Sequence, residues 1–83
     1  MSLERLKNAK KAIGAKQTTK AIERGQAEIV FIADDAENWV TQPVRELCEQ
    51  KGVTVVVVPT MQELGKACGI DVGAAAAAVL KNP

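Results

Sequence analysis

Histidine and tyrosine are absent from the 83 residues, and the aromatic side chains are one phenylalanine and one tryptophan. Without histidine, the chain lacks the commonest metal ligand and general base. With only Phe31 and Trp39, the core must be aliphatic, and a surface that stacks several bases on exposed rings is disfavoured. Trp39 is either an exposed contact or a partly buried packing residue, and its size favours the second.

Cysteine is scarce as well. Cys48 and Cys68 lie in apolar helical contexts and form no Cys-x-x-Cys pair. We expect free, buried, structural thiols, which indicate a cytoplasmic protein. The alanine-rich segment 73–80 is the most apolar part of the chain, yet it is far shorter than the roughly 20 residues that span a bilayer. The first 24 residues are too charged for the apolar region of a signal peptide.

No group of residues in the sequence indicates catalysis. Asp34 and Asp35 could hold a metal or act as acid and base, but neighbours in a strand face opposite ways, so a strand-ending turn is the better interpretation. Gly65 and Gly69 lack the spacing of a phosphate loop and the Lys-Ser/Thr that follows it. We therefore predict no enzyme activity, no cofactor and no metal site.

The charges that are present are unevenly distributed. The net charge is +1, but residues 1–24 hold seven basic and two acidic residues, a balance of +5. Residues 25–51 hold two basic and six acidic residues, a balance of −4. This asymmetry indicates a surface that faces a polyanion, although an ordinary solvated helix face explains the charges equally well.

The basic residues gather where a glycine precedes a helix. After Gly14, the cations Lys16, Lys20 and Arg24 follow every four residues, which places them on one helical face. The unpaired N–H groups of a helix start attract anions. Gln17 lies among the cations and carries a donor and an acceptor that could read a base edge. On these residues alone, an RNA-binding face and a plain charged surface both remain open.

Periodicity predicts helices alternating with strands. Apolar residues at helical spacing predict a first helix over 3–13, with Ser2 as its N-cap. A second helix is expected from 16 to 24, ended by Gly25. Segment 27–33 is rich in β-branched and aromatic residues and predicts a strand.

The second half of the chain continues the alternation. Pro43 suits the first position of a third helix, which Gly52 ends. Segment 53–58 is a continuous apolar run, typical of a parallel interior strand. Thr60 begins a capping-box sequence, so a fourth helix is expected from Thr60 to Gly69. Together these elements predict a single domain of the α/β sandwich class.

The segment 73–80 is ambiguous. Its run of alanines favours a helix by propensity. A helix of that length without a polar face would be marginal, however. Small residues also suit a central strand that helices cover closely, so both structures remain open.

Three motifs in this order make the sequence resemble one family. They are Gly14-x-Lys16-Gln17-Thr18-x-Lys20-Ala21, then Ile29-Val30-Phe31-Ile32-Ala33-x-Asp35, then Leu64-Gly65-Lys66-Ala67-Cys68-Gly69. The chain resembles the kink-turn-binding ribosomal protein superfamily, the seven-Ae / thirty-e group. It is most similar to the small bacterial stand-alone members of the YbxF type, especially over residues 69–76. The resemblance covers essentially all of residues 1–83, as one kink-turn RNA-binding domain.

The resemblance implies a fold. It is a three-layer α-β-α sandwich around a four-stranded mixed sheet. The alanine-rich tail would then be a strand, against its helix propensity. A strand-like piece is also implied near residues 13–15.

The resemblance further implies a ligand, an RNA duplex with a sharp kink flanked by tandem sheared G·A pairs. Lys16 and Gln17 would contact the guanines, and Lys20 a guanine or a nearby phosphate. Gly14 would allow close approach of the backbone, and loop 58–61 would cradle the nucleotide flipped out at the kink. The RNA-binding residues expected in total are Gly14, Lys16, Gln17, Thr18, Lys20, Arg24, Val58, Pro59, Thr60 and Met61.

One departure from part of the family bears on this site. Archaeal members carry Asn-Glu where this chain has Lys16-Gln17, which follows the bacterial and thirty-e pattern. The pair is more basic and richer in donors, so the guanine contacts need not be identical.

The expected protein is thus a cytoplasmic monomer that recognises and stabilises kink-turns in structured RNA. Ribosomal RNA, a riboswitch and a ribonuclease RNA all remain open as the partner. The alternative is a protein-interaction module on the same fold, which docks on a ribosome or ribonucleoprotein through Trp39 and the acidic middle. A nucleotide or small-molecule enzyme is disfavoured because histidine and a phosphate loop are missing.

Overall fold

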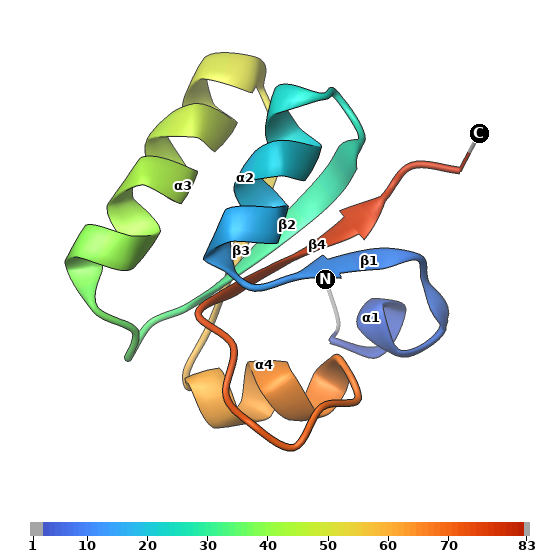
Figure 1. The fold of residues 1–83 in the computed structure, drawn as a ribbon, viewed down its shortest axis with the longest axis vertical. Helices are drawn as coiled ribbons and strands as arrows, with labels where there is room; N and C mark the ends of the chain where they lie inside the picture. Colours follow the sequence, from blue (N-terminus) through green and yellow to red (C-terminus); the bar gives the residue numbers. More distant parts are fainter. Residues whose placement is uncertain (1–2, 83) are drawn as a thin grey trace.

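A four-stranded mixed sheet forms the centre of the computed structural model, which describes residues 3–82 (Figure 1). Its strand order is β1-β4-β2-β3. Strands β2 and β3 are parallel, whereas β4 runs antiparallel to both β1 and β2. The strands are β1 (Lys11–Ile13), β2 (Ala27–Ala33), β3 (Thr54–Val58) and β4 (Ala76–Leu80).

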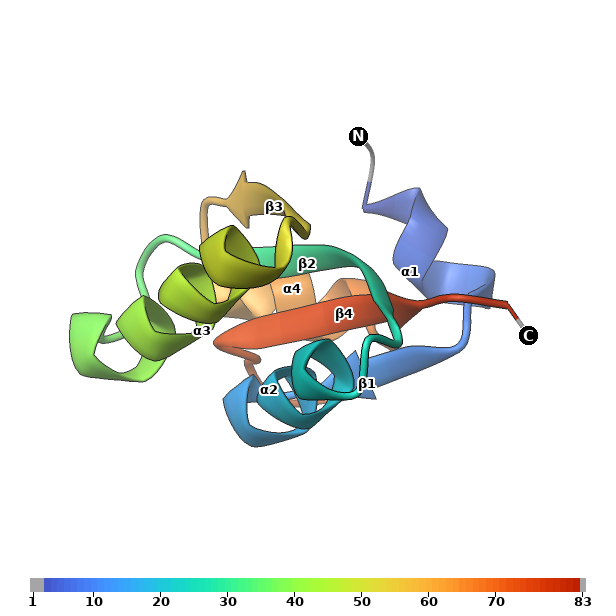
Figure 2. The same cartoon turned by 90° about the horizontal axis from the view of Figure 1, so that it is seen from above.

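Helices cover both faces of this sheet. They are α1 (Glu4–Asn8), α2 (Ala15–Glu23), α3 (Asn38–Lys51) and α4 (Met61–Ala67). Helices α2 and α3 lie on one face, and α1 and α4 lie on the other (Figure 1, Figure 2). The predicted α/β class and the three-layer sandwich are therefore confirmed.

The alternation of side chains along β2 builds two cores. Val30 and Ile32 pack with Ala21 and Ile22 of α2 on one face. The residues between them, such as Phe31, pack under α1 and α4 on the opposite face. Because successive strand residues point to opposite faces, an unbroken apolar strand needs cover on both sides, which the two helix layers provide.

The alanine-rich tail forms β4, as the family resemblance implied. Ala76, Ala77 and Ala78 are fully buried between β1 and β2 and beneath both helix layers. Their small side chains let the helices approach the sheet from both sides. Tertiary burial thus overrides the helix propensity of an alanine run.

The helix expected over 3–13 is wrong in its second half. Helix α1 ends at Asn8, and residues 11–13 instead pair with β4, slightly earlier than the strand-like piece expected near 13–15. The Lys11 amine donates to the Leu6 carbonyl at 2.6 Å, which satisfies an acceptor at the helix end. The expected N-cap, Ser2, lies outside the described residues.

The boundaries of four elements follow the predictions closely. The second helix begins one residue early, at Ala15, and the strand over 27–33 is confirmed. Gly52 ends α3 with φ +69°, a conformation that glycine adopts without steric cost. Helix α4 ends at Ala67, two residues before the predicted Gly69.

Two expectations about the middle of the chain are wrong. Helix α3 begins at Asn38 and contains Pro43 within its second turn, so its start cannot be read from the proline. Strand β3 is parallel to β2 as predicted, but it lies at the edge of the sheet. The strand is nevertheless apolar on both faces, because Val55 packs against the core on one face of the sheet and Val56 against the core on the other.

Trp39 is 74% exposed, so the expectation of a partly buried packing residue is wrong. Both cysteines are free and buried, as predicted. Burial raises the pKa of both thiols, and the nearby Lys11 amine opposes this rise only at Cys68. Cys48 and Cys68 belong to different cores on opposite faces of the sheet. Within residues 3–82, no helix is long and apolar enough to cross a membrane.

The N-cap of α4, Thr60, gives a first test of the fold. Thr60 Oγ1 accepts a hydrogen bond from the Glu63 N–H at 3.1 Å. Thr60→Ala is expected to lower the free energy of unfolding by about 1 kcal/mol, measured by urea denaturation. Thr60→Ser keeps the hydroxyl and should unfold like the parent. An alanine variant as stable as the parent would show that the cap contributes nothing.

Candidate nucleic-acid interface

Gly14 fixes the start of α2 to the sheet. Its N–H donates to the Ala76 carbonyl at 2.8 Å, and its carbonyl accepts from the Thr18 N–H at 2.9 Å. Its φ of +95° requires glycine, and a Cβ placed there would meet nothing within 4 Å. The helix start therefore faces open space, as close approach of a ligand requires.

The first turn of α2 carries partial positive charge. No side chain caps this end, and no acidic residue lies in the first turn. The unpaired N–H groups and the helix dipole therefore favour an anion at this point.

Four exposed polar side chains extend from this helix start along α2. They are Lys16, Gln17, Lys20 and Arg24. None of them forms an ion pair or a side-chain hydrogen bond with another residue in the range 3–82. These donors are therefore free to bind a ligand with acceptor atoms.

A hollow of about 360 Å³ separates α2 from β1. Gln17, Lys20 and Arg24 line it from the helix, and Gln26 lines it from the start of β2. No carboxylate is among its lining residues. Sequence reasoning did not single out Gln26, whose N–H donates to the Ala21 carbonyl at 2.9 Å and so holds it at the end of α2.

A second hollow of about 410 Å³ lies on the other side of α2, against α3. Lys16 and Lys20 line it opposite the exposed ring of Trp39. The indole N–H of Trp39 donates to the Glu37 carboxylate. Helix α2 is thus a basic ridge between two hollows, and Lys20 lines both.

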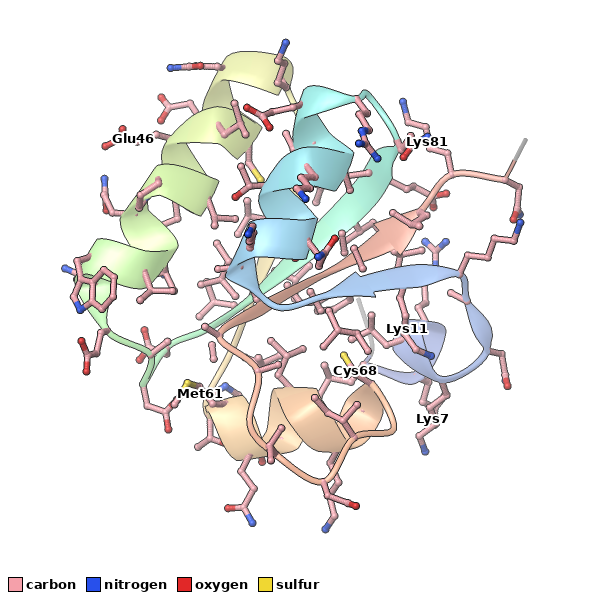
Figure 3. All side chains as sticks on the ribbon, viewed as in Figure 1. Lys7, Lys11, Glu46, Met61, Cys68 and Lys81 are labelled. Carbon is pink, nitrogen blue, oxygen red and sulfur yellow. The ribbon has the colours of Figure 1, made fainter. Side chains whose placement is uncertain are left out.

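The loop between β3 and α4 is held by contacts with the end of β2. The Val58 carbonyl accepts from the Asp34 N–H at 2.8 Å. The Met61 N–H donates to Asp35 Oδ1, also at 2.8 Å, and Figure 3 shows Met61 at the start of α4. Asp35 therefore orders this loop, in agreement with the structural interpretation of the Asp34-Asp35 pair. Among residues 3–82, no cluster of three or more acidic or cysteine side chains could hold a metal ion.

Strand pairing places the helix start and this loop at the same end of the sheet. The end of β1 pairs with the start of β4, and the end of β2 pairs with that same part of β4. The end of β3 lies beside the end of β2, where Ala33 pairs with Val58. Three strand spacings separate the two segments, roughly 14 Å. One extended ligand could therefore contact both.

Two of the expected site residues have side chains that the fold buries. Thr18 is fully buried beside Ala21 and Ile22, and its Oγ1 has no hydrogen-bond partner among the described residues. The Val58 side chain is 4% exposed and packs in the core beneath α4. Neither side chain can contact a ligand. The remaining expected residues keep at least partial exposure: Gly14, Lys16, Gln17, Lys20, Arg24, Pro59, Thr60 and Met61.

Comparison with known proteins gives consistent results. The chain is 52% identical over 69 residues to an RNA-binding protein of Caldanaerobacter subterraneus. The aligned residues cover 83% of this chain and 84% of that protein. It is 52% identical over 68 residues to the large ribosomal subunit protein eL8 of Halobacterium salinarum, covering 81% of this chain and 57% of that protein.

A solved structure shares the fold. The Giardia lamblia 15.5kD RNA binding protein superposes with a TM-score of 0.88 at 32% identity, over 96% of this chain and 71% of that protein. The sequence model of one family matches residues 2–83. The chain therefore belongs to the ribosomal protein L7Ae/L30e/S12e/Gadd45 family.

Proposed function

We propose that this chain binds RNA through the exposed face of α2 together with loop 59–61, and that it recognises and stabilises kink-turns. The observation that carries the proposal is the uncapped start of α2, beside which Lys16, Gln17 and Lys20 have no side-chain partner among residues 3–82. The names of similar proteins, an RNA-binding protein and a ribosomal protein, support the same class of ligand.

A kinked RNA fits this surface better than a regular duplex. A-form RNA hides its base edges in a deep, narrow major groove. A kink beside sheared G·A pairs opens that groove and exposes guanine O6 and N7, two acceptors that match Lys and Gln donors. The kink also brings phosphates together, and their repulsion is offset by the helix start with Lys16 and Lys20.

The proposed activity is binding without turnover. A protein that binds only the bent RNA stabilises it by mass action and shifts the population toward that state. The conformational equilibrium of the RNA would then report the activity. The proposal includes a cytoplasmic location and a monomeric state.

The proposal is tested with a kink-turn RNA that carries a fluorophore at each end. A matched control RNA has Watson–Crick pairs in place of the G·A pairs. Titration with the protein is expected to raise energy transfer in the first RNA and not in the second. Affinity should fall as salt rises, because neutralised phosphates release counterions. Equal binding to both RNAs would reduce the α2 face to a non-specific polyanion surface.

A second candidate function has one observation in its favour. Trp39 is 74% exposed and borders an apolar hollow, so α3 could dock on a protein partner of a ribosome or ribonucleoprotein. This candidate predicts no G·A-dependent binding at any salt concentration. Because Trp39 is the single tryptophan, its fluorescence distinguishes RNA at the adjacent hollow from binding elsewhere.

A further inference from the structure

Three chain segments meet at the end of the sheet opposite the helix start. They are the residue before β1, the residue before β2 and the residue after β4. The Leu80 N–H donates to the Lys10 carbonyl, and the Lys81 N–H donates to the Gln26 carbonyl, both at 2.8 Å. These bonds fix Lys10, Gln26 and Lys81 side by side, and Figure 3 shows Lys81 beyond the end of β4.

A hollow of about 380 Å³ lies at this end and is lined by Lys10, Gln26, Leu80 and Lys81, among others. It shares Gln26 and Leu80 with the hollow between α2 and β1. The two hollows therefore adjoin at Gln26 and Leu80, just beyond the end of α2. We call the surface of these two adjoining hollows the α2 track, formed by Gln17, Lys20, Arg24, Gln26, Lys10 and Lys81.

The α2 track has no carboxylate in either hollow. The two acidic residues that flank it in sequence are directed elsewhere. Glu23 lines the hollow on the α3 side of the helix. Glu28 forms an ion pair with Arg5 of α1 at 2.6 Å. The cations of the α2 track thus have no protein counter-charge among residues 3–82.

An internal role explains two of these cations. Lys20 lies in the last turn of α2 and Arg24 is its C-cap residue, where positive charges favour the helix dipole. Lys10 and Lys81 are exposed and have no ion pair with a described residue. Lys10 and Lys81 line one hollow, so their charges repel each other, and an external polyanion would offset that repulsion.

Resting on the proposed function, we infer that the α2 track binds the phosphate backbone of an RNA arm that continues beyond the kink. The nine residues of α2 span about 14 Å, a length over which several consecutive phosphates of one strand would lie. Lysine and arginine contacts to phosphates position a duplex without reading its sequence. One duplex arm of the natural RNA therefore extends along the α2 track, beyond the base pairs next to the kink.

The inference is tested with the double variant Lys10→Gln plus Lys81→Gln. Two kink-turn RNAs of equal length and sequence are compared, one with ordinary phosphates and one with uncharged methylphosphonate linkages in the outer base pairs, one arm at a time. The variant is expected to bind the ordinary RNA roughly three- to tenfold more weakly than the parent. Its salt slope should fall by about two. Against the RNA neutralised in the correct arm, parent and variant should bind equally.

The matched control is Lys7→Gln plus Lys51→Gln, which removes the same charge from α1 and α3, outside the α2 track. It should lose much less affinity and keep its sensitivity to the neutral arm. If both double variants lose affinity equally, only net charge matters and the α2 track is not a site. If Lys10→Gln plus Lys81→Gln binds like the parent while binding stays G·A-dependent, the inference fails and the proposed function stands. If the parent protein does not discriminate the G·A pairs, the proposed function fails with it.

Discussion

Gly65→Ala is expected to remove a large part of the stability of the fold. Gly65 lies within α4, where alanine would ordinarily be preferred by about 1 kcal/mol. A Cβ at this position would lie 2.0 Å from the Val72 carbonyl oxygen and 3.2 Å from the Gly73 Cα. These are backbone atoms, so no side-chain rotation relieves the clash. Steric exclusion therefore outweighs helix propensity and reverses the sign of the effect.

The expected loss is roughly 3 kcal/mol or more, at the upper end for overpacking, because the backbone after α4 has to move. For a domain of this size that is a large fraction of the total free energy of unfolding. The measurement is urea denaturation followed by circular dichroism. Lys66→Ala, an exposed neighbour in the same helix, should stay within about 0.5 kcal/mol of the parent. A Gly65→Ala variant as stable as the parent would contradict the close packing of α4 on segment 70–73.

This contact also connects the scaffold to the site. The Ile70 N–H donates to the Gly65 carbonyl at 3.1 Å, and the Ala74 N–H donates to the Met61 carbonyl at 3.0 Å. Segment 70–74 thus leads the chain from α4 into β4. The first residue of β4, Ala76, binds Gly14. Movement of the backbone in segment 70–74 would therefore also displace Gly14 at the start of α2.

The parts of the fold that the sequence predicted well are those with local causes. Segment 27–33 became a strand because its β-branched residues suit burial on two faces. Gly52 ended a helix through its own backbone freedom. The prediction for segment 11–13 was wrong because its apolar spacing fits a helix, whereas the strand with which it pairs, β4, lies more than sixty residues away in the sequence. Propensity alone could not have placed the alanine run in a strand, and the family resemblance did.

The candidate site divides in the same way. The helix-start residues are contiguous in sequence, so their grouping was visible before folding. The side chain of Thr18 is buried, as its spacing to Ala21 and Ile22 on the inner face of α2 indicates. Lys10, Gln26 and Lys81 escaped notice because only strand pairing brings three distant segments together. The exposed Trp39 carried no sequence signal of its exposure.

The second large effect is expected at the two positions of α2 that we propose contact a base and a phosphate. Gln17→Ala and Lys20→Ala should each weaken kink-turn binding by roughly 1–3 kcal/mol. Both side chains are exposed and have no partner among residues 3–82, so neither change should alter the free energy of unfolding by more than about 0.5 kcal/mol. Gln50→Ala and Lys51→Ala make the same substitutions at exposed positions of α3 and should bind like the parent.

The two variants should differ in the salt dependence of binding and in the preference for G·A pairs. Lys20 lines both hollows beside α2, so its loss should reduce the salt slope by about one wherever it neutralises a phosphate. Gln17 is neutral, so its loss should leave the salt slope unchanged and reduce the preference for G·A pairs over Watson–Crick pairs. Titrations of both labelled RNAs at several salt concentrations separate these results. Parent-like affinity in both variants would remove α2 from the RNA interface, because no other change tests its exposed face so directly.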